Sequence, residues 1–117
     1  MAEHDHEVIV VATFIAREDK ADEGEKFLRK IVAPTHESPD CLLLALHRAL
    51  DDPNKFVFIE RWVSRETLEA SYETQVFKSF IQDSLAYFDG PPEITLCAAV
   101  PDGQPSKGSL AGASSSS

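Results

Sequence analysis

Residues 55–80 read KFVFIERWVSRETLEASYETQVFKSF, and the spacing of their apolar side chains changes halfway along. From Phe56 to Trp62 successive side chains can alternate between two faces, as they do in a β-strand. After Ser64 the apolar residues recur at helical intervals, and Ser64 itself is a favourable helix N-cap. The stretch therefore predicts a strand that leads directly into a helical region.

One carboxylate, that of Glu60, falls on a face of this strand that is otherwise aromatic. The alternation places Glu60 with Phe58 and Trp62. Desolvation raises the pKa of a carboxyl group on an apolar face, which makes Glu60 a candidate for acid–base chemistry. A structural ion pair with Arg48 or Arg61, within the chain or across a dimer, is the alternative role for this carboxylate.

Residues 41–50 (CLLLALHRAL) precede this strand and could form a helix by composition. We predict a strand, because the segment is short and lies between Pro39 and the polar link at residues 51–54 (DDPN). Such a link predicts a hairpin with the strand that follows. Both faces of this hairpin are then largely apolar.

The pairing expected for this hairpin brings a histidine close to Glu60. If Leu50 pairs with Lys55, His47 faces Phe58 and lies diagonal to Glu60 on the same sheet face. Because an imidazole titrates near neutral pH, His47 is then a candidate general base. A structural histidine, bonded to a backbone carbonyl or to Glu60, is the alternative.

The remaining segments complete a mixed pattern of strands and helices. Residues 8–16 (VIVVATFIA) have the composition of a central strand, and residues 94–100 (ITLCAAV) form the last strand. Residues 21–33 carry an amphipathic helical stripe that we expect Pro34 to end. The order of strand, helix, strand, strand, helix, strand predicts a ferredoxin-like α+β fold (βαββαβ), an antiparallel sheet with helices on one face.

Helices on one face leave the other face of such a sheet without cover. The predicted strands at residues 8–16 and 41–50 are apolar on both faces, so the helix-free face also needs an apolar partner. A second copy of the same sheet is the simplest partner, and we therefore predict a homodimer.

Length and composition limit what the chain can be. A chain of 117 residues fits one small domain, which we place at residues 1–101, followed by a flexible tail rich in Ser and Gly at residues 102–117. A net charge of −9 argues against nucleic acid as a partner. The sequence has neither an apolar run long enough to span a membrane nor an N-terminal secretory signal, so we expect a cytoplasmic protein.

Patterns that bind metals or phosphates are missing from the sequence. Cys41 and Cys97 fit no metal spacing, and we interpret His4-Asp5-His6 as a solvated N-terminal arm. The sequence has no glycine-rich phosphate loop and no nucleophile elbow. Any reaction must therefore use ordinary acid–base groups and the substrate itself.

Residues 56–80 resemble the core motif of the antibiotic biosynthesis monooxygenase family. The resemblance rests on Glu60-Arg61-Trp62, the acidic turn that follows, and the later Leu and Phe, and it covers roughly residues 7–100. It implies a dimeric α+β barrel, in which two sheets pack face to face, without a cofactor or a metal. One position departs from the family pattern, because Ser71 stands where the family often has His.

The resemblance also implies an activity, the oxidation of an aromatic polyol or quinol with dioxygen. Deprotonation of the phenol gives an anion that reduces dioxygen, and the resulting peroxide collapses to a quinone and water. The protein then supplies a base, a dry aromatic pocket and an orienting hydrogen bond. The alternative function is a non-catalytic dimeric barrel that binds a small hydrophobic ligand, and the serine at position 71 favours it.

The predicted site joins catalytic and substrate-binding residues. His47 and Glu60 are the candidate catalytic residues. The candidate substrate-binding residues are Trp62, Ser71, Tyr72, Phe77 and Phe80. Packing in the core is the alternative role of Trp62, Phe77 and Phe80, and Tyr72 could equally lie at the rim of the pocket.

Overall fold

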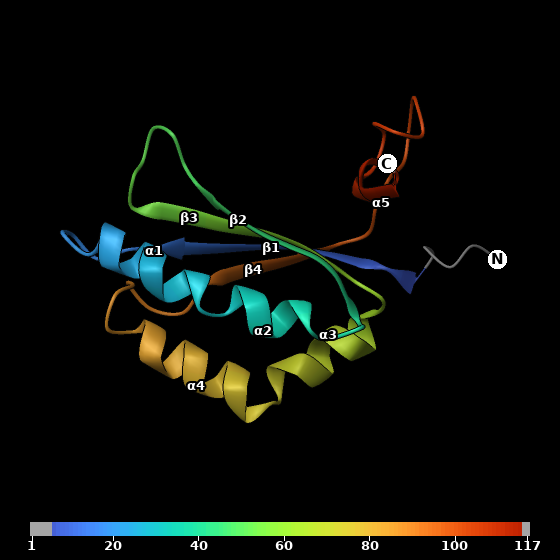
Figure 1. Cartoon of the computed structure of the whole chain (residues 1–117). Coiled ribbons are helices and arrows are strands. Elements are labelled where there is room, and N and C mark those ends of the chain that lie inside the picture. Colours follow the sequence, from blue (N-terminus) through green and yellow to red (C-terminus); the bar gives the residue numbers. More distant parts are fainter. Residues whose placement is uncertain (1–5, 116–117) are drawn as a thin grey trace.

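Four strands form an antiparallel sheet in the computed structural model, which describes residues 6–115, and helices cover one face of that sheet (Figure 1). The strands are β1 (Val8–Ile15), β2 (Cys41–Arg48), β3 (Lys55–Trp62) and β4 (Glu93–Cys97). The helices are α1 (Ala21–Arg29), α2 (Val32–His36), α3 (Arg65–Tyr72), α4 (Gln75–Ser84) and α5 (Leu110–Ser115). The sheet order β2-β3-β1-β4 confirms the predicted ferredoxin-like α+β fold.

The helical region after β3 begins at the predicted cap. Ser64 Oγ accepts a hydrogen bond from Thr67 N at 3.1 Å, and Ser64 N donates to Thr67 Oγ1 at 3.2 Å, so the two residues form a capping box. Thr74 caps a second helix, since its hydroxyl accepts from Phe77 N at 3.2 Å. The two apolar stripes seen in the sequence therefore belong to two helices, α3 and α4.

Helix α1 ends earlier than the sequence indicated. We expected one helix over residues 21–33 that Pro34 would end, but α1 stops at Arg29 and a separate short helix, α2, begins at Val32. Pro34 lies in the first turn of α2, where a backbone N–H has no partner within the helix. Proline is tolerated at that position, so it does not mark a helix end here.

The register of the β2–β3 hairpin differs by one residue from the prediction. His47 pairs with Val57 and Leu44 with Glu60, and Ala49 N donates to Lys55 O at 2.9 Å. A shift of one residue moves every side chain of a strand to the opposite face. His47 is therefore exposed on the helix-free face, 3.3 Å from the carbonyl oxygen of Val57, and the predicted pairing of His47 with Glu60 is wrong.

Burial explains why this register prevails. It places Leu44 and Leu46 under the helices, whereas the predicted register would have placed Ala45 and His47 there. Leu50, which we expected to pair, lies in the connecting loop and is 98% exposed. Burying two leucine side chains stabilises the hairpin more than burying an alanine and a polar imidazole.

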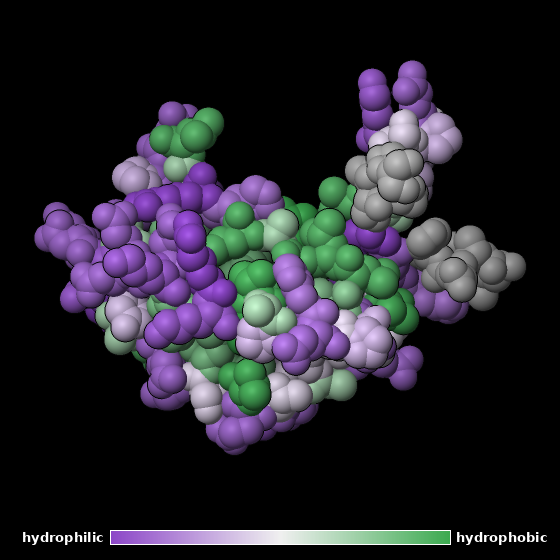
Figure 2. All heavy atoms as spheres, in the orientation of Figure 1, coloured by the Kyte–Doolittle hydropathy of each residue, from purple (hydrophilic) through white to green (hydrophobic). Residues whose placement is uncertain are grey.

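The sheet face opposite helices α1–α4 is apolar and partly open in the single chain. The alternation along β1 and β3 places Ile9, Val11, Val57 and Ile59 on this face, and each is only half-buried. Figure 2, which views the sheet from its side, shows hydrophobic surface in the middle of the molecule between hydrophilic ends. This face has the apolar character from which we predicted a partner.

Residues 102–115 include the short helix α5, which lies on the side of the sheet opposite α1–α4 (Figure 1). The term helix-free face therefore means the face that α1–α4 do not cover. The flexibility expected for residues 102–117 stays a prediction, and His4 and Asp5 of the expected N-terminal arm lie outside the described residues. Within residues 6–115, no helix is long and apolar enough to cross a bilayer. In the same part of the chain, no three His, Cys, Asp or Glu side chains lie close enough together to hold a metal ion.

Helix α1 packs on the sheet through a contact that only glycine permits. Gly24 is buried, and a Cβ atom added there would lie 2.8 Å from Cζ of the Phe88 ring. That ring is itself fully buried and makes edge contacts with Phe14 and Phe56, at centroid distances of 5.3 and 6.1 Å. The aromatic core therefore cannot give way easily to a larger residue at position 24.

We predict that Gly24→Ala destabilises the protein by about 1–3 kcal/mol, because the clash with Phe88 outweighs the better helix propensity of alanine. Urea unfolding measures this change in the free energy of unfolding. The exposed Lys26 of the same helix offers the control, and Lys26→Ala should change stability by less than about 0.5 kcal/mol. A more stable Gly24→Ala variant would contradict the prediction.

Candidate functional site

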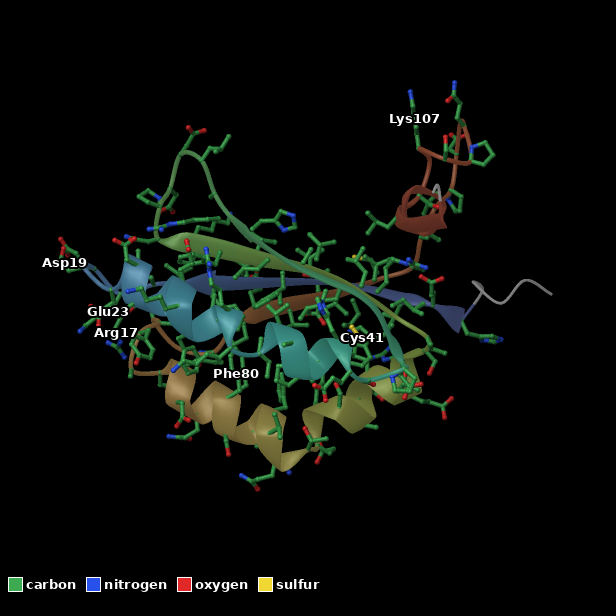
Figure 3. The ribbon with its side chains drawn as sticks, viewed as in Figure 1. Arg17, Asp19, Glu23, Cys41, Phe80 and Lys107 are labelled. Carbon is green, nitrogen blue, oxygen red and sulfur yellow. The ribbon has the colours of Figure 1, made fainter. Side chains whose placement is uncertain are left out.

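A cavity of about 430 Å³ lies between the helix-covered face of the sheet and helices α2, α3 and α4. Aromatic side chains form much of its wall: Phe14, Phe58, Trp62, Tyr72, Phe77 and Phe80. Figure 3 shows Phe80 on the side of α4 that faces the sheet. A cavity of this size with a mostly apolar lining suits a small organic ligand.

Glu60 is the carboxylate on the sheet side of this cavity. Trp62 Nε1 donates a hydrogen bond of 2.8 Å to Glu60 Oε1, and the two side chains share a face because they are two residues apart on a strand. Burial raises the pKa of Glu60, and the hydrogen bond from Trp62 opposes part of that shift. The carboxyl group therefore keeps its proton to a higher pH than an exposed glutamate does.

The two arginines that could have neutralised Glu60 have other partners. Arg48 binds two carboxylates of α1, each at 3.1 Å, and Arg61 binds Glu7 at 2.6 Å on the opposite face of the sheet. Within the described part of the chain Glu60 forms no ion pair. The intrachain form of the structural alternative considered for Glu60 is therefore wrong, whereas an ion pair across a dimer stays a prediction.

A β-bulge at the start of β2 brings a thiol close to Glu60. The register shifts between Cys41 and Leu43, which pairs Cys41 with Trp62 and places it on the helix-covered side. Burial, and then the charge of nearby Glu60, raise the pKa of the Cys41 thiol. Cys41, at the start of β2 in Figure 3, is therefore a neutral neighbour of the carboxylate.

Tyr72 lines the cavity from α3 and carries a persistent hydroxyl donor. Burial, together with the charges of Glu60 and Glu69, raises the pKa of Tyr72 to about 12. The phenol therefore stays protonated at neutral pH. Its ring lies 4.7 Å from the ring of Phe77, measured between centroids, so the two rings form one wall.

Ser71 also lines the cavity, but its proton is used within the helix. Ser71 Oγ donates to Leu68 O at 2.6 Å. The hydroxyl can still accept a hydrogen bond, although it cannot act as a base near neutral pH as histidine does.

The cavity unites all the predicted site residues except His47. Its lining includes Glu60, Trp62, Ser71, Tyr72, Phe77 and Phe80. His47 instead borders a separate groove beside the edge strand β2, together with residues of α1 and α2. The functional roles assigned to the six residues stay predictions. His47 was added to them because of the expected hairpin register, which the structure does not have.

Several lining residues were missed in the sequence. Strand alternation would have identified Phe14 had β1 been assigned a buried face, and it did place Phe58 on the face of Glu60, although Phe58 was not included among the site residues. Asp40 contributes a second carboxylate, from the loop before β2. Its backbone carbonyl accepts from Val63 N at 3.0 Å, which holds the loop beside the end of β3. No local pattern marks such a loop residue.

A ferredoxin-like sheet with an aromatic cavity under its helices defines an α+β domain with space for a small molecule. The chain belongs to the antibiotic biosynthesis monooxygenase family, whose model matches residues 7–83. A curated relative, sll1783 from Synechocystis, is 24% identical over 92 residues, which span 79% of this chain and 63% of that protein.

Solved structures show the same architecture. A structure described as an antibiotic biosynthesis monooxygenase is 29% identical with a TM-score of 0.73, covering 80% of this chain and 99% of that one. PA3566 from Pseudomonas aeruginosa is 27% identical with a TM-score of 0.74, covering 81% and 95%. SnoaB from Streptomyces nogalater, described as a cofactor-independent oxygenase, shares the fold at 21% identity, with a TM-score of 0.73 and coverages of 83% and 96%.

The raised pKa of Glu60 predicts how Glu60→Gln changes stability with pH. Ionising Glu60 costs more in the folded protein than in the unfolded chain, so wild type loses stability relative to the variant as pH rises from below the ordinary value of 4.5. We expect urea unfolding at several pH values to show that the free energy of unfolding of wild type, relative to that of Glu60→Gln, falls between acid and neutral pH. A difference independent of pH would contradict this expectation. Asp83→Asn, which removes an exposed carboxylate of α4, controls for the lost charge.

Proposed function

We propose that this protein is a cofactor-free monooxygenase that oxidises an electron-rich phenol or quinol with dioxygen in the cavity. The proposal rests on one observation: Glu60, with a raised pKa and no ion pair in the described chain, faces an aromatic cavity and is held by Trp62. Membership of the antibiotic biosynthesis monooxygenase family supports it. Glu60 replaces His47 as the base, since His47 lies on the other face of the sheet.

Each lining group has a task in this proposal. Glu60 accepts the proton of the phenol, and the indole N–H of Trp62 keeps the carboxylate aimed at the cavity. The phenol of Tyr72 donates a hydrogen bond to an oxygen of the bound substrate. The aromatic walls exclude water, which would otherwise hydrate the carboxylate and the anion that it forms.

The reaction consumes one dioxygen for each phenol. Glu60 takes the hydroxyl proton of a phenol that has a hydrogen on its para carbon, and the phenolate gives one electron to dioxygen. The phenoxyl radical and superoxide combine at the para carbon, and protonated Glu60 returns its proton to the peroxide. Loss of the para hydrogen as a proton and cleavage of the O–O bond then leave a quinone carbonyl and release water.

A second candidate function is binding of a small hydrophobic ligand without catalysis. Ser71 favours this function, because a serine whose hydroxyl donates to Leu68 O supplies no base at a position where the family often has histidine. The two functions differ in one measurable respect, since only the first consumes dioxygen above the spontaneous rate.

Oxygen uptake tests the proposed base. With a dihydroxynaphthalene that has a free para position, we expect wild type to consume dioxygen and form the quinone faster than the buffer does. Glu60→Gln should lower this turnover by roughly 10²-fold, the usual contribution of general-base catalysis. His47→Gln, on the opposite face of the sheet, should leave it unchanged. Equal turnover in wild type and Glu60→Gln would remove Glu60 as the base, and no uptake by wild type would favour the binding function.

We further propose that the protein is a homodimer that pairs the helix-free faces of two sheets. Support comes from the half-buried apolar residues of that face, Ile9, Val11, Val57 and Ile59 among them. Removing apolar surface of this kind from water lowers the free energy, so an assembly that buries it is stabilised. A second copy of the same face is the partner that closed symmetry provides.

Light scattering should return the mass of a dimer at micromolar concentration, with an interface larger than about 1,200 Å² in total. Ile59→Lys places a charge on the helix-free face and should shift the mass toward that of one chain. Val76→Lys, at a position that is 62% exposed on α4, should remain a dimer. A monomer mass for wild type would contradict the proposed assembly.

A further inference from the structure

The charged groups that line the cavity have one sign. Glu60 and Asp40 contribute carboxylates, and the described residues of the lining include no Lys, Arg or His. Two arginines close in sequence to Glu60 form ion pairs with other carboxylates. Arg61 binds Glu7 at 2.6 Å, and Arg65 binds a carboxylate of its own helix at 3.1 Å. A negatively charged ligand group therefore meets no described cation on the cavity wall.

The hydroxyl groups of the lining offer few donors as well. Ser71 donates to Leu68 O at 2.6 Å, and Thr74 donates to Ser71 O at 2.8 Å. Thr35 and Thr67 likewise donate to backbone carbonyls, at 2.7 and 2.9 Å. Each of these hydroxyl protons is used within the local chain, so none of them is available to donate to a ligand.

Two lining hydroxyls remain as donors, those of Tyr72 and Ser38. The described structure gives the Tyr72 hydroxyl no hydrogen-bond partner. Ser38 Oγ accepts from Asp40 N at 3.3 Å and donates to no group among the described residues. Burial, together with the charges of Glu60 and Glu69, raises the pKa of Tyr72 to about 12, so this phenol stays protonated. Two neutral donors satisfy oxygens of a neutral ligand, but they cannot replace the hydration shell of a carboxylate, a sulfate or a phosphate.

We propose that the cavity selects its ligand by charge: it accepts an uncharged aromatic whose hydroxyl donates to Glu60 and rejects the same ring system when it carries an anionic group. This inference rests on the proposed function for the location of the ligand, and it adds the class of substrate. An anion beside the Glu60 carboxylate would bring two like charges into a poorly hydrated site. A precursor with a free carboxylate would therefore have to lose or esterify it before oxidation at this site.

Binding measurements test the selection without any turnover. The probes are a naphthol, the hydroxynaphthoic acid built on the same rings, and the methyl ester of that acid, each titrated anaerobically into the full chain by calorimetry at neutral pH. The ester matches the acid in size but carries no charge, so the comparison of these two separates charge from fit. We expect the naphthol and the ester to bind similarly and the acid to bind at least about tenfold more weakly.

Glu60→Gln assigns the effect to one side chain. This substitution removes the charge and keeps the size of the side chain. It should reduce the ratio of the dissociation constants of acid and ester by about tenfold. Asp83→Asn removes the same charge from an exposed position on α4 and should leave the difference as in wild type, which separates the local field from the net charge of −9. If Glu60→Gln does not fold, the comparison of acid with ester on wild type decides by itself.

Several results would overturn the inference: equal affinity of wild type for acid and ester, a difference that survives in Glu60→Gln, or no binding of the uncharged probes. Failure of the proposed function is a separate outcome. A protein that binds the ester, rejects the acid and consumes no dioxygen would keep the charge selection and lose the oxygenase role. One that consumes dioxygen yet binds acid and ester equally would keep the oxygenase role and lose the selection.

Discussion

The hydrogen bond of 2.8 Å from Trp62 Nε1 to Glu60 Oε1 depends on the alternation of side chains along β3. Both side chains lie on the helix-covered face of β3. Strand β3 is an interior strand, with β2 on one side and β1 on the other. The indole N–H orients one carboxylate oxygen while burial raises the pKa of the group. A largely buried, oriented carboxyl group is thus built into an interior strand of the sheet.

The short helices around the cavity shape its chemistry through their own stability. Helices of this length gain much from caps and side-chain bonds to the backbone, and Thr67 and Thr74 supply such bonds at 2.9 and 2.8 Å. The protons used in this way are no longer available to a ligand. Local helix stability therefore leaves the helices with few hydroxyl donors for a ligand, and that of Tyr72 is one of them.

Periodicity predicted the fold and most of the candidate site, because period 2 and period 3.6 each assign side chains to a face. Glu60 and Trp62 followed from the first, and Phe77 and Phe80 from the second. The register of the hairpin could not be predicted in this way, since the apolar Leu50 resembles a strand residue but lies in the loop. Which face of β2 is buried depends on tertiary packing, including that of α2 against β2, which the periodicity of β2 does not specify, so His47 was placed on the wrong side.

The same strand explains why the Glu60 carboxylate has no cationic partner in the described part of the cavity. Arg61 lies between Glu60 and Trp62 in the sequence, and alternation sends its guanidinium to the other face, where it binds Glu7 at 2.6 Å in a buried pair. A shift of β3 by one residue would exchange these faces, and Arg61 would then enter the cavity while Glu60 left it. The sheet itself thus separates a neighbouring acid and base by its own thickness. The order Glu60-Arg61-Trp62 therefore produces a carboxylate in the cavity on one face of the sheet and a paired arginine on the other, largely apolar face.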